Sequence, residues 1–159
     1  MDSRHAAAVD ATLDNFLHRL PVMVGLEESA LQFLGNLAGE ERFAAGAVIV
    51  REGDPGDRVF FVCEGKVRVV KGHGTPHPVP LAEMGPGDYF GEMSLVESVA
   101  RSASVVAVEP VRAFTLKGIN FYKLYREQPD QYGIVVLNIA RDLARRLRRL
   151  DERFVAVSH

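Results

Sequence analysis

The amino-acid sequence predicts a mainly β protein, an antiparallel barrel or jelly roll with helices before and after it. Apolar residues recur at helical spacing up to residue 37 and again beyond Gly118. Between Gly39 and Lys117 they form short runs rich in valine and phenylalanine, separated by glycine, proline and aspartate. At 159 residues, 47% of them hydrophobic, the chain is long enough for one core and too short for two comfortable domains.

The first segment, residues 6–37, is expected to form two helices. Its apolar positions lie three and four residues apart: Leu13, Phe16, Leu17, Leu20, then Ala30, Phe33, Leu34 and Leu37. Pro21 and Gly25 interrupt this pattern. The sequence therefore predicts a helix, a break and a second helix.

The central segment is expected to hold about seven short strands. They are "AVIVRE", "RVFFVCE", "KVRVVK", "PVPLAEM", "DYF", "SASVVAV" and "VRAFTLK". A Pro-Gly-Asp turn precedes an aromatic strand twice, in "EGDPGDRVFF" at 52–61 and in "MGPGDYF" at 84–90. Turns at such regular intervals favour an antiparallel barrel or jelly roll.

The last segment is expected to form a helix in "INFYKLYREQ" and, after Pro129, another that runs to about Phe154. An apolar stripe follows the second helix at a spacing of 4, 3, 4, 3 and 4: Val136, Ala140, Leu143, Leu147, Leu150 and Phe154. This spacing is typical of a coiled-coil seam or a docking face. Six arginines, at 141, 145, 146, 148, 149 and 153, surround the stripe, and we interpret them as a solvated helix face.

Charge and cysteine content exclude several classes of protein. A net charge of −2 excludes a polycation that binds nucleic acid by charge alone. The single Cys63 excludes an internal disulfide framework and a zinc site built from several thiolates. His73 and His77 are interpreted as a solvated hairpin tip, so no metal is expected. Apolar runs are too short for a membrane span, no signal peptide is predicted, and we expect a cytoplasmic protein.

Residues 89–105, "YFGEMSLVESVARSASV", combine an acid beside a glycine with one arginine nine positions further on. Arg101 offers a planar fork that can meet two phosphate oxygens and stays charged inside a pocket. Gly91 lacks the Cβ that would keep a ligand from the backbone. "EMSLV" can form one helical turn whose free N–H groups point toward a phosphate. The segment therefore suits a small cyclic phosphate.

Glu92 needs a different partner, because its carboxylate cannot favour a phosphate. A ribose 2′-hydroxyl beside the phosphate could donate a hydrogen bond to it. Ser102 can add a hydroxyl donor, and Ala103 leaves space. The alternative is that Glu92 and Arg101 pair with each other, an arrangement that needs no ligand.

This segment closely resembles the phosphate-binding cassette of the cyclic nucleotide-binding domain, the family of the catabolite activator protein, protein kinase A regulatory subunits and cyclic nucleotide-gated channels. The resemblance extends over the strands from 43 to 117 and the flanking helices. It implies a mainly β fold, an antiparallel jelly-roll-like β-roll with an N-terminal helical segment and two C-terminal helices. We expect one domain over 1–159: helices in 1–39, the β-roll in 40–117 with the cassette at 90–104, and helices in 118–156.

The resemblance also implies which residues bind the ligand. By family position, Gly91 and Glu92 hold the ribose and Arg101 binds the phosphate. Ser102 favours cAMP over cGMP, because many family members that prefer cGMP have threonine there. The full set of expected ligand-binding residues is Phe90, Gly91, Glu92, Met93, Ser94, Arg101, Ser102, Ala103, Val69 and Leu81. "ARRL" at 144–147 resembles the dimerisation helix of the activators, and that alignment places Leu150 and Asp151 near the base.

The expected function is a non-enzymatic receptor for cAMP or cGMP that needs no cofactor and signals through its C-terminal helix. The output would be an unknown protein partner or a homodimer formed through that helix. No helix-turn-helix follows in this sequence, so direct DNA binding is not expected, nor is membrane binding. The alternatives are a ligand-free interaction module and a sensor of another ligand, such as a cyclic dinucleotide or haem. Intact Glu92 and Arg101 argue against both, and no catalytic motif supports an enzyme.

Overall fold

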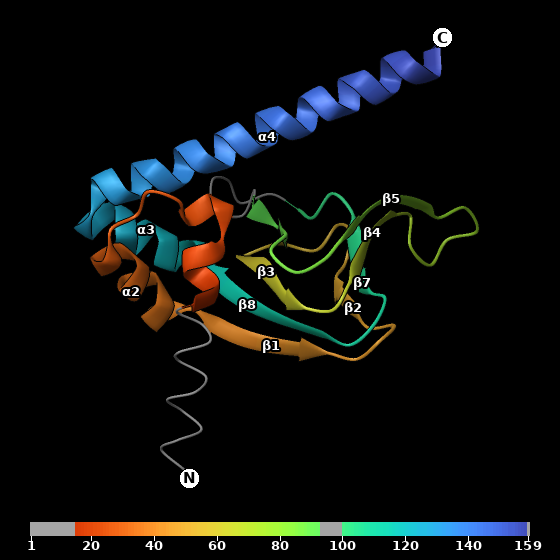
Figure 1. The fold of residues 1–159 in the computed structure, drawn as a ribbon. Helices are drawn as coiled ribbons and strands as arrows, with labels where there is room; N and C mark the ends of the chain where they lie inside the picture. The colour runs from red at the N-terminus through yellow and green to blue at the C-terminus, as the bar shows by residue number, and fades with distance from the viewer. Residues whose placement is uncertain (1–14, 93–99, 159) are drawn as a thin grey trace.

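The computed structural model describes residues 15–92 and 100–158. It has two antiparallel four-stranded sheets with helices packed on one side, which confirms the predicted fold class (Figure 1). One sheet has the order β1 (Gly39–Phe43), β8 (Val111–Lys117), β3 (Arg58–Glu64), β6 (Tyr89–Phe90). The other has the order β2 (Val48–Val50), β7 (Ser104–Ala107), β4 (Val67–Lys71), β5 (Val79–Met84).

Strand β3 lies at the centre of the molecule and is buried on both faces. Phe60 and Val62 point to a core between the two sheets, which β4, β7 and β8 also line. Val59 and Phe61 point to a second core between this sheet and the helices. Because successive side chains of a strand alternate between its faces, one unbroken apolar run serves two cores. The sheet that contains β3 is therefore the middle layer.

The helical layer is built from segments before and after the strands, which pack together. Residues 15–19 are helical, and they are followed by η1 (Pro21–Met23), α2 (Glu28–Leu37), α3 (Gly118–Glu127) and α4 (Pro129–Ser158). The predicted break after the first helix is confirmed by η1 and by Gly25, whose φ is +90°. The Asn138 side chain of α4 donates hydrogen bonds to the carbonyls of Val22 at 3.0 Å and Val24 at 2.8 Å. These bonds hold α4 against the N-terminal turn.

Strand β1 was missed by the sequence prediction, which expected about seven strands. Its sequence, GEERF, contains three charged residues and no apolar alternation. Among the described strands it forms the edge of its sheet and pairs with β8 alone, from Gly39 opposite Thr115 to Phe43 opposite Val111. An edge strand can keep charged side chains in solvent while its backbone completes the ladder, so hydrophobic pattern alone does not reveal it.

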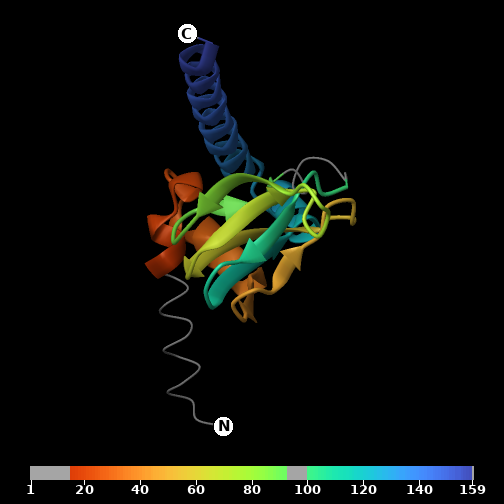
Figure 2. The ribbon, with the colours of Figure 1, turned by 90° about the vertical axis from the view of Figure 1, so that its right-hand side faces the viewer.

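Helix α4 packs on the hydrophobic core along its first half. Val135 and Ile139 are buried in the core beneath the helices, and Val136 and Leu143 pack against that core. Further along, the exposed fraction reaches 59% at Leu147, and Figure 2 shows the end of the helix projecting away from the rest of the molecule. No helix in residues 15–92 or 100–158 has the length and the apolar character needed to cross a membrane.

Candidate functional site

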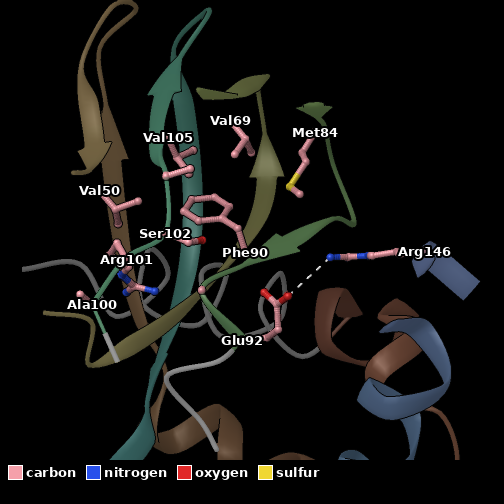
Figure 3. A pocket seen from close by; sticks show the side chains of 12 residues that line it. Val50, Val69, Met84, Phe90, Glu92, Ala100, Arg101, Ser102, Val105 and Arg146 are labelled. Atoms are coloured by element: carbon pink, nitrogen blue, oxygen red, sulfur yellow. Dashed lines mark ion pairs between the residues drawn. The ribbon is translucent and has the colours of Figure 1, made fainter. Parts of the chain in front are cut away.

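A cavity of about 370 Å³ opens between the second sheet and the two segments that carry Glu92 and Arg101 (Figure 3). Its lining residues are Val50, Val69, Met84, Phe90, Gly91, Glu92, Ala100, Arg101, Ser102, Ala103, Val105 and Arg146. Every predicted site residue that the structure describes lines this cavity, except Leu81. Met93 and Ser94 lie outside the described residues. The cavity combines an apolar wall with an arginine and a carboxylate, the composition of a small-ligand site.

Backbone hydrogen bonds hold Arg101 in the cavity. Its N–H donates to the carbonyl of Asp54, and its own carbonyl accepts from the N–H of Gly53, both at 2.8 Å. The guanidinium Nη2 donates to the carbonyl of Arg58 at 2.8 Å. The turn after β2 and the start of β3 thus fix an arginine of the cassette that lies more than forty positions further along the chain.

The Arg101 guanidinium has no paired carboxylate within the described part of the chain. Burial lowers the pKa of Arg101 from its ordinary value, while Asp57 and Glu92 act in the opposite direction from a distance. Glu92 and Arg101 do not form an ion pair, so the ligand-free pairing considered from the sequence is not what the structure has. A partly desolvated cation without a counterion favours binding of an anion.

Gly91 lies directly against this arginine. Its φ of +83° is one that side chains rarely allow, and a Cβ there would meet Nη1 of Arg101 and lie 2.9 Å from the carbonyl oxygen of Arg58. From the sequence we expected the glycine to admit a ligand to the backbone. In the structure its first role is to admit the guanidinium, which passes over the place that a side chain would fill.

Glu92 connects the site to α4. Its Oε1 lies 3.7 Å from Nη1 of Arg146, whose Nη2 lies 3.0 Å from Oδ2 of Asp142, one turn earlier on the helix. The hydroxyl of Tyr89 donates to the same Asp142 oxygen at 2.5 Å. Burial, and then the hydrogen bond to Asp142, raise the pKa of Tyr89 far above its ordinary value, so the hydroxyl remains a donor.

The apolar wall differs from the prediction at one position. Val69 lines the cavity as expected, whereas Leu81 is 53% exposed and is not among the residues that line it. Ala82 is the register partner of Val69, and Leu81 precedes it at the irregularity between the Val69 and Val70 pairs. Neighbouring positions on a strand face opposite sides, so the wall is completed by Met84.

Sequence reasoning missed five lining residues: Val50, Met84, Ala100, Val105 and Arg146. Alternation along the strand from Ala103 could have found Val105. No local signal marks Arg146 among the six arginines that were interpreted as a solvated face. The alignment had placed Leu150 and Asp151 near the base, but the α4 residue at the cavity lies one turn earlier and Leu150 is 61% exposed.

Comparison with known proteins gives the same family as the resemblance of the sequence. The family model described as the cyclic nucleotide-binding domain matches residues 40–128. The cyclic AMP receptor protein of Thermus thermophilus is 36% identical over 131 residues, which are 82% of this chain and 59% of that protein. A cyclic nucleotide-gated potassium channel of Mesorhizobium japonicum is 48% identical over 86 residues, 54% of this chain and 22% of the channel.

Solved structures show the same relationship. The crystal structure of the Thermus thermophilus catabolite activator protein superposes with a TM-score of 0.72 at 35% identity, over 87% of this chain and 63% of that one. The chain thus spans less than two thirds of each of these relatives. The family match covers more than half of the chain and includes both segments that line the cavity apart from α4. The chain belongs to the cyclic nucleotide-binding domain family.

Proposed function

We propose that this chain is a receptor for a 3′,5′-cyclic mononucleotide and that it binds cAMP more tightly than cGMP, with no other cofactor. The observation that carries the proposal is the Arg101 guanidinium, partly buried at the cavity and without a carboxylate partner among the described residues. A cyclic phosphate supplies the missing anion and can take both parallel N–H groups of the fork.

The rest of the cavity suits the rest of such a ligand. Glu92, 15% exposed, offers an acceptor for the ribose 2′-hydroxyl. Val50, Val69 and Met84 form an apolar wall beyond it, to which a purine can pack (Figure 3). A volume of about 370 Å³ is at the small end of the range for ligand sites, which suits a mononucleotide better than a cyclic dinucleotide.

The preference for cAMP is proposed on Ser102. This residue lines the cavity, and its hydroxyl has no hydrogen-bond partner among the residues that the structure describes. Serine at this position resembles the cAMP-binding activators, and one relative is named a cyclic AMP receptor protein.

Transmission through α4 is part of the proposal. The helix contacts the site through Arg146 and exposes Leu147 and Leu150 further along. These leucines offer a surface to a protein partner or to a second copy of the chain. An interaction of that kind would let the domain regulate a partner without catalysing a reaction itself.

Isothermal titration calorimetry with cAMP, cGMP and cyclic di-GMP tests the proposal. We expect one saturable site for cAMP, weaker binding of cGMP and no binding of cyclic di-GMP. Binding of none of the three would support the ligand-free module, and binding of cyclic di-GMP alone would support a different sensor. The Arg101→Ala variant is the control: loss of the binding heat in this variant would show that the ligand binds in this cavity.

A further inference from the structure

Arg146 is the one residue of α4 that lines the cavity within the described part of the chain. Its side chain is 33% exposed, and its Nη1 lies 3.7 Å from the carboxylate of Glu92. In Figure 3 the guanidinium of Arg146 points toward Glu92, and the dashed line marks the ion pair between them. The acceptor that we assign to the ribose is therefore already paired in this structure.

The arginine is held in this place by two other residues. Oδ2 of Asp142 forms an ion pair with its Nη2 at 3.0 Å, and the Tyr89 ring lies beneath the guanidinium, 4.9 Å from ring centre to Cζ. Tyr89 is buried, and its hydroxyl fixes Asp142 in turn. A side chain with two anchors loses little further conformational entropy when it pairs with Glu92. The pair is thus more than a chance contact between two mobile surface charges.

Arg146 and a bound ribose would both interact with the Glu92 carboxylate, so the two interactions compete. A neutral hydroxyl gains most from a carboxylate whose charge is not already compensated. To accept the 2′-hydroxyl in full, Glu92 has to weaken or leave its contact with Arg146. The same demand does not arise for a ligand that lacks the hydroxyl, since its phosphate is bound by Arg101.

We propose that Arg146 competes with the ribose 2′-hydroxyl for Glu92 and so determines how strongly the site prefers ribose over 2′-deoxyribose. This inference rests on the proposed function and assigns a specificity-determining role to a residue outside the cassette. Asp142 is a positioning residue in this scheme, because it offers Arg146 a second carboxylate. The preference for ribose is therefore set from α4 as well as from Glu92.

The measured quantity is the ratio of the dissociation constant of 2′-deoxy-cAMP to that of cAMP. Arg146 also attracts the phosphate of any nucleotide, but that effect is the same for both ligands and cancels in the ratio. In Arg146→Gln, Glu92 is free for the hydroxyl, and we expect the ratio to rise by roughly two- to fivefold, the effect of an ion pair near the surface. Arg145→Gln, an exposed neighbour on the same helix, removes an equal charge and should leave the ratio unchanged.

Asp142→Asn gives a change of opposite sign. Without the second carboxylate, Arg146 has Glu92 as its remaining ionic partner in residues 15–92 and 100–158, so the ratio should fall below that of the unchanged protein. General damage to α4 would not move the two variants in opposite directions. In the double variant Arg146→Gln with Glu92→Gln, the gain in ratio should disappear, since the acceptor is gone.

A ratio that is unchanged or lower in Arg146→Gln overturns the inference, and equal weakening of both ligands would make Arg146 a phosphate-attracting group only. Thermal unfolding without nucleotide verifies that each variant is folded. If the unchanged protein binds neither nucleotide, the proposed function fails and this inference fails with it. If it binds both but the ratio does not respond, only the inference fails.

Discussion

The guanidinium of Arg101 occupies the space that a side chain on residue 91 would need, so Gly91 and Arg101 are compatible only as a pair. Arg101 also donates to the carbonyl of Arg58, whose oxygen would lie 2.9 Å from a Cβ on residue 91. The glycine and the arginine are ten positions apart in the sequence, and their proximity explains why a cassette of this kind needs both.

Replacing Gly91 by alanine should weaken cAMP binding at least about tenfold. The new Cβ meets Arg101 and strains a backbone with φ of +83°, so the guanidinium must move from its carbonyl partner. Gly85→Ala is the matched control, because a Cβ there has nothing within 4 Å and its φ is not in the left-handed region. Titration calorimetry on both variants checks this, and equal affinities would show that Arg101 does not need the space.

Arg101→Ala should weaken cyclic nucleotide binding by about 2 to 5 kcal/mol, because a phosphate in the cavity is left without its cation. Arg101→Lys should also lose affinity, since a point charge replaces a bidentate fork. Dissociation constants for cAMP measure both losses. An unchanged constant in the alanine variant would place the phosphate elsewhere.

Glu92→Gln should weaken the binding of cAMP far more than the binding of 2′-deoxy-cAMP. The carboxylate's proposed partner is the 2′-hydroxyl, and only cAMP carries it. Competition of the two ligands against a fluorescent cyclic nucleotide measures the two losses side by side. Losses of equal size would mean that Glu92 acts on the ligand by some route other than the ribose.

Stability should depend on pH through Asp57. Arg58 donates to its Oδ1 at 2.8 Å and holds the pKa of this carboxyl below its ordinary value of 3.8. A lowered folded-state pKa means that the stabilisation is complete above the unfolded-state pKa and is lost as pH falls through the folded-state pKa. Asp57 is 68% exposed, so we expect only about 0.5 kcal/mol.

Urea unfolding of the unchanged protein and of Asp57→Asn tests this dependence. The free energy of unfolding should be lower in the variant at pH 7, and the difference should shrink toward pH 3. A difference that stays constant over this range would assign the effect to packing and not to charge.

Helix α4 should respond to ligand in its exposed half. Residues 144–157 lie outside the core in this structure, and Arg146 links them to the site. If nucleotide contacts form when the helix packs down, cAMP should slow backbone hydrogen exchange in 144–157. Residues 134–143 serve as an internal reference, because Val135 and Ile139 are buried without ligand.

Sedimentation at several concentrations distinguishes a lid from a dimer. A lid predicts one sedimentation coefficient at all concentrations, whereas a coiled-coil seam predicts one that rises with concentration. Exchange that is identical with and without cAMP would mean that no signal passes through this helix.

The sequence by itself determined the architecture and the centre of the site. Valine- and phenylalanine-rich runs bounded by glycine, proline and aspartate predicted the strands from β2 to β8, because those signals are local and strands such as β3 and β8 bury their apolar side chains. The sequence also identified Gly91, Glu92 and Arg101, because the chemistry of a glycine, an acid and an arginine at this spacing follows from the residue types alone. Local sequence signals did not predict β1, because its charged side chains, which suit an edge strand, show no hydrophobic alternation.

Only the tertiary structure decided which side chains complete the cavity. The choice of Met84 over Leu81 depends on the register of β5 against β4 and on its irregularity, and a shift of one residue reverses the face. The choice of Arg146 among six arginines depends on how α4 is rotated and how far along the sheet it lies, which Val135, Ile139 and Asn138 set through distant contacts. Side-chain types are written in the sequence, whereas these two placements come from packing between segments far apart in the chain.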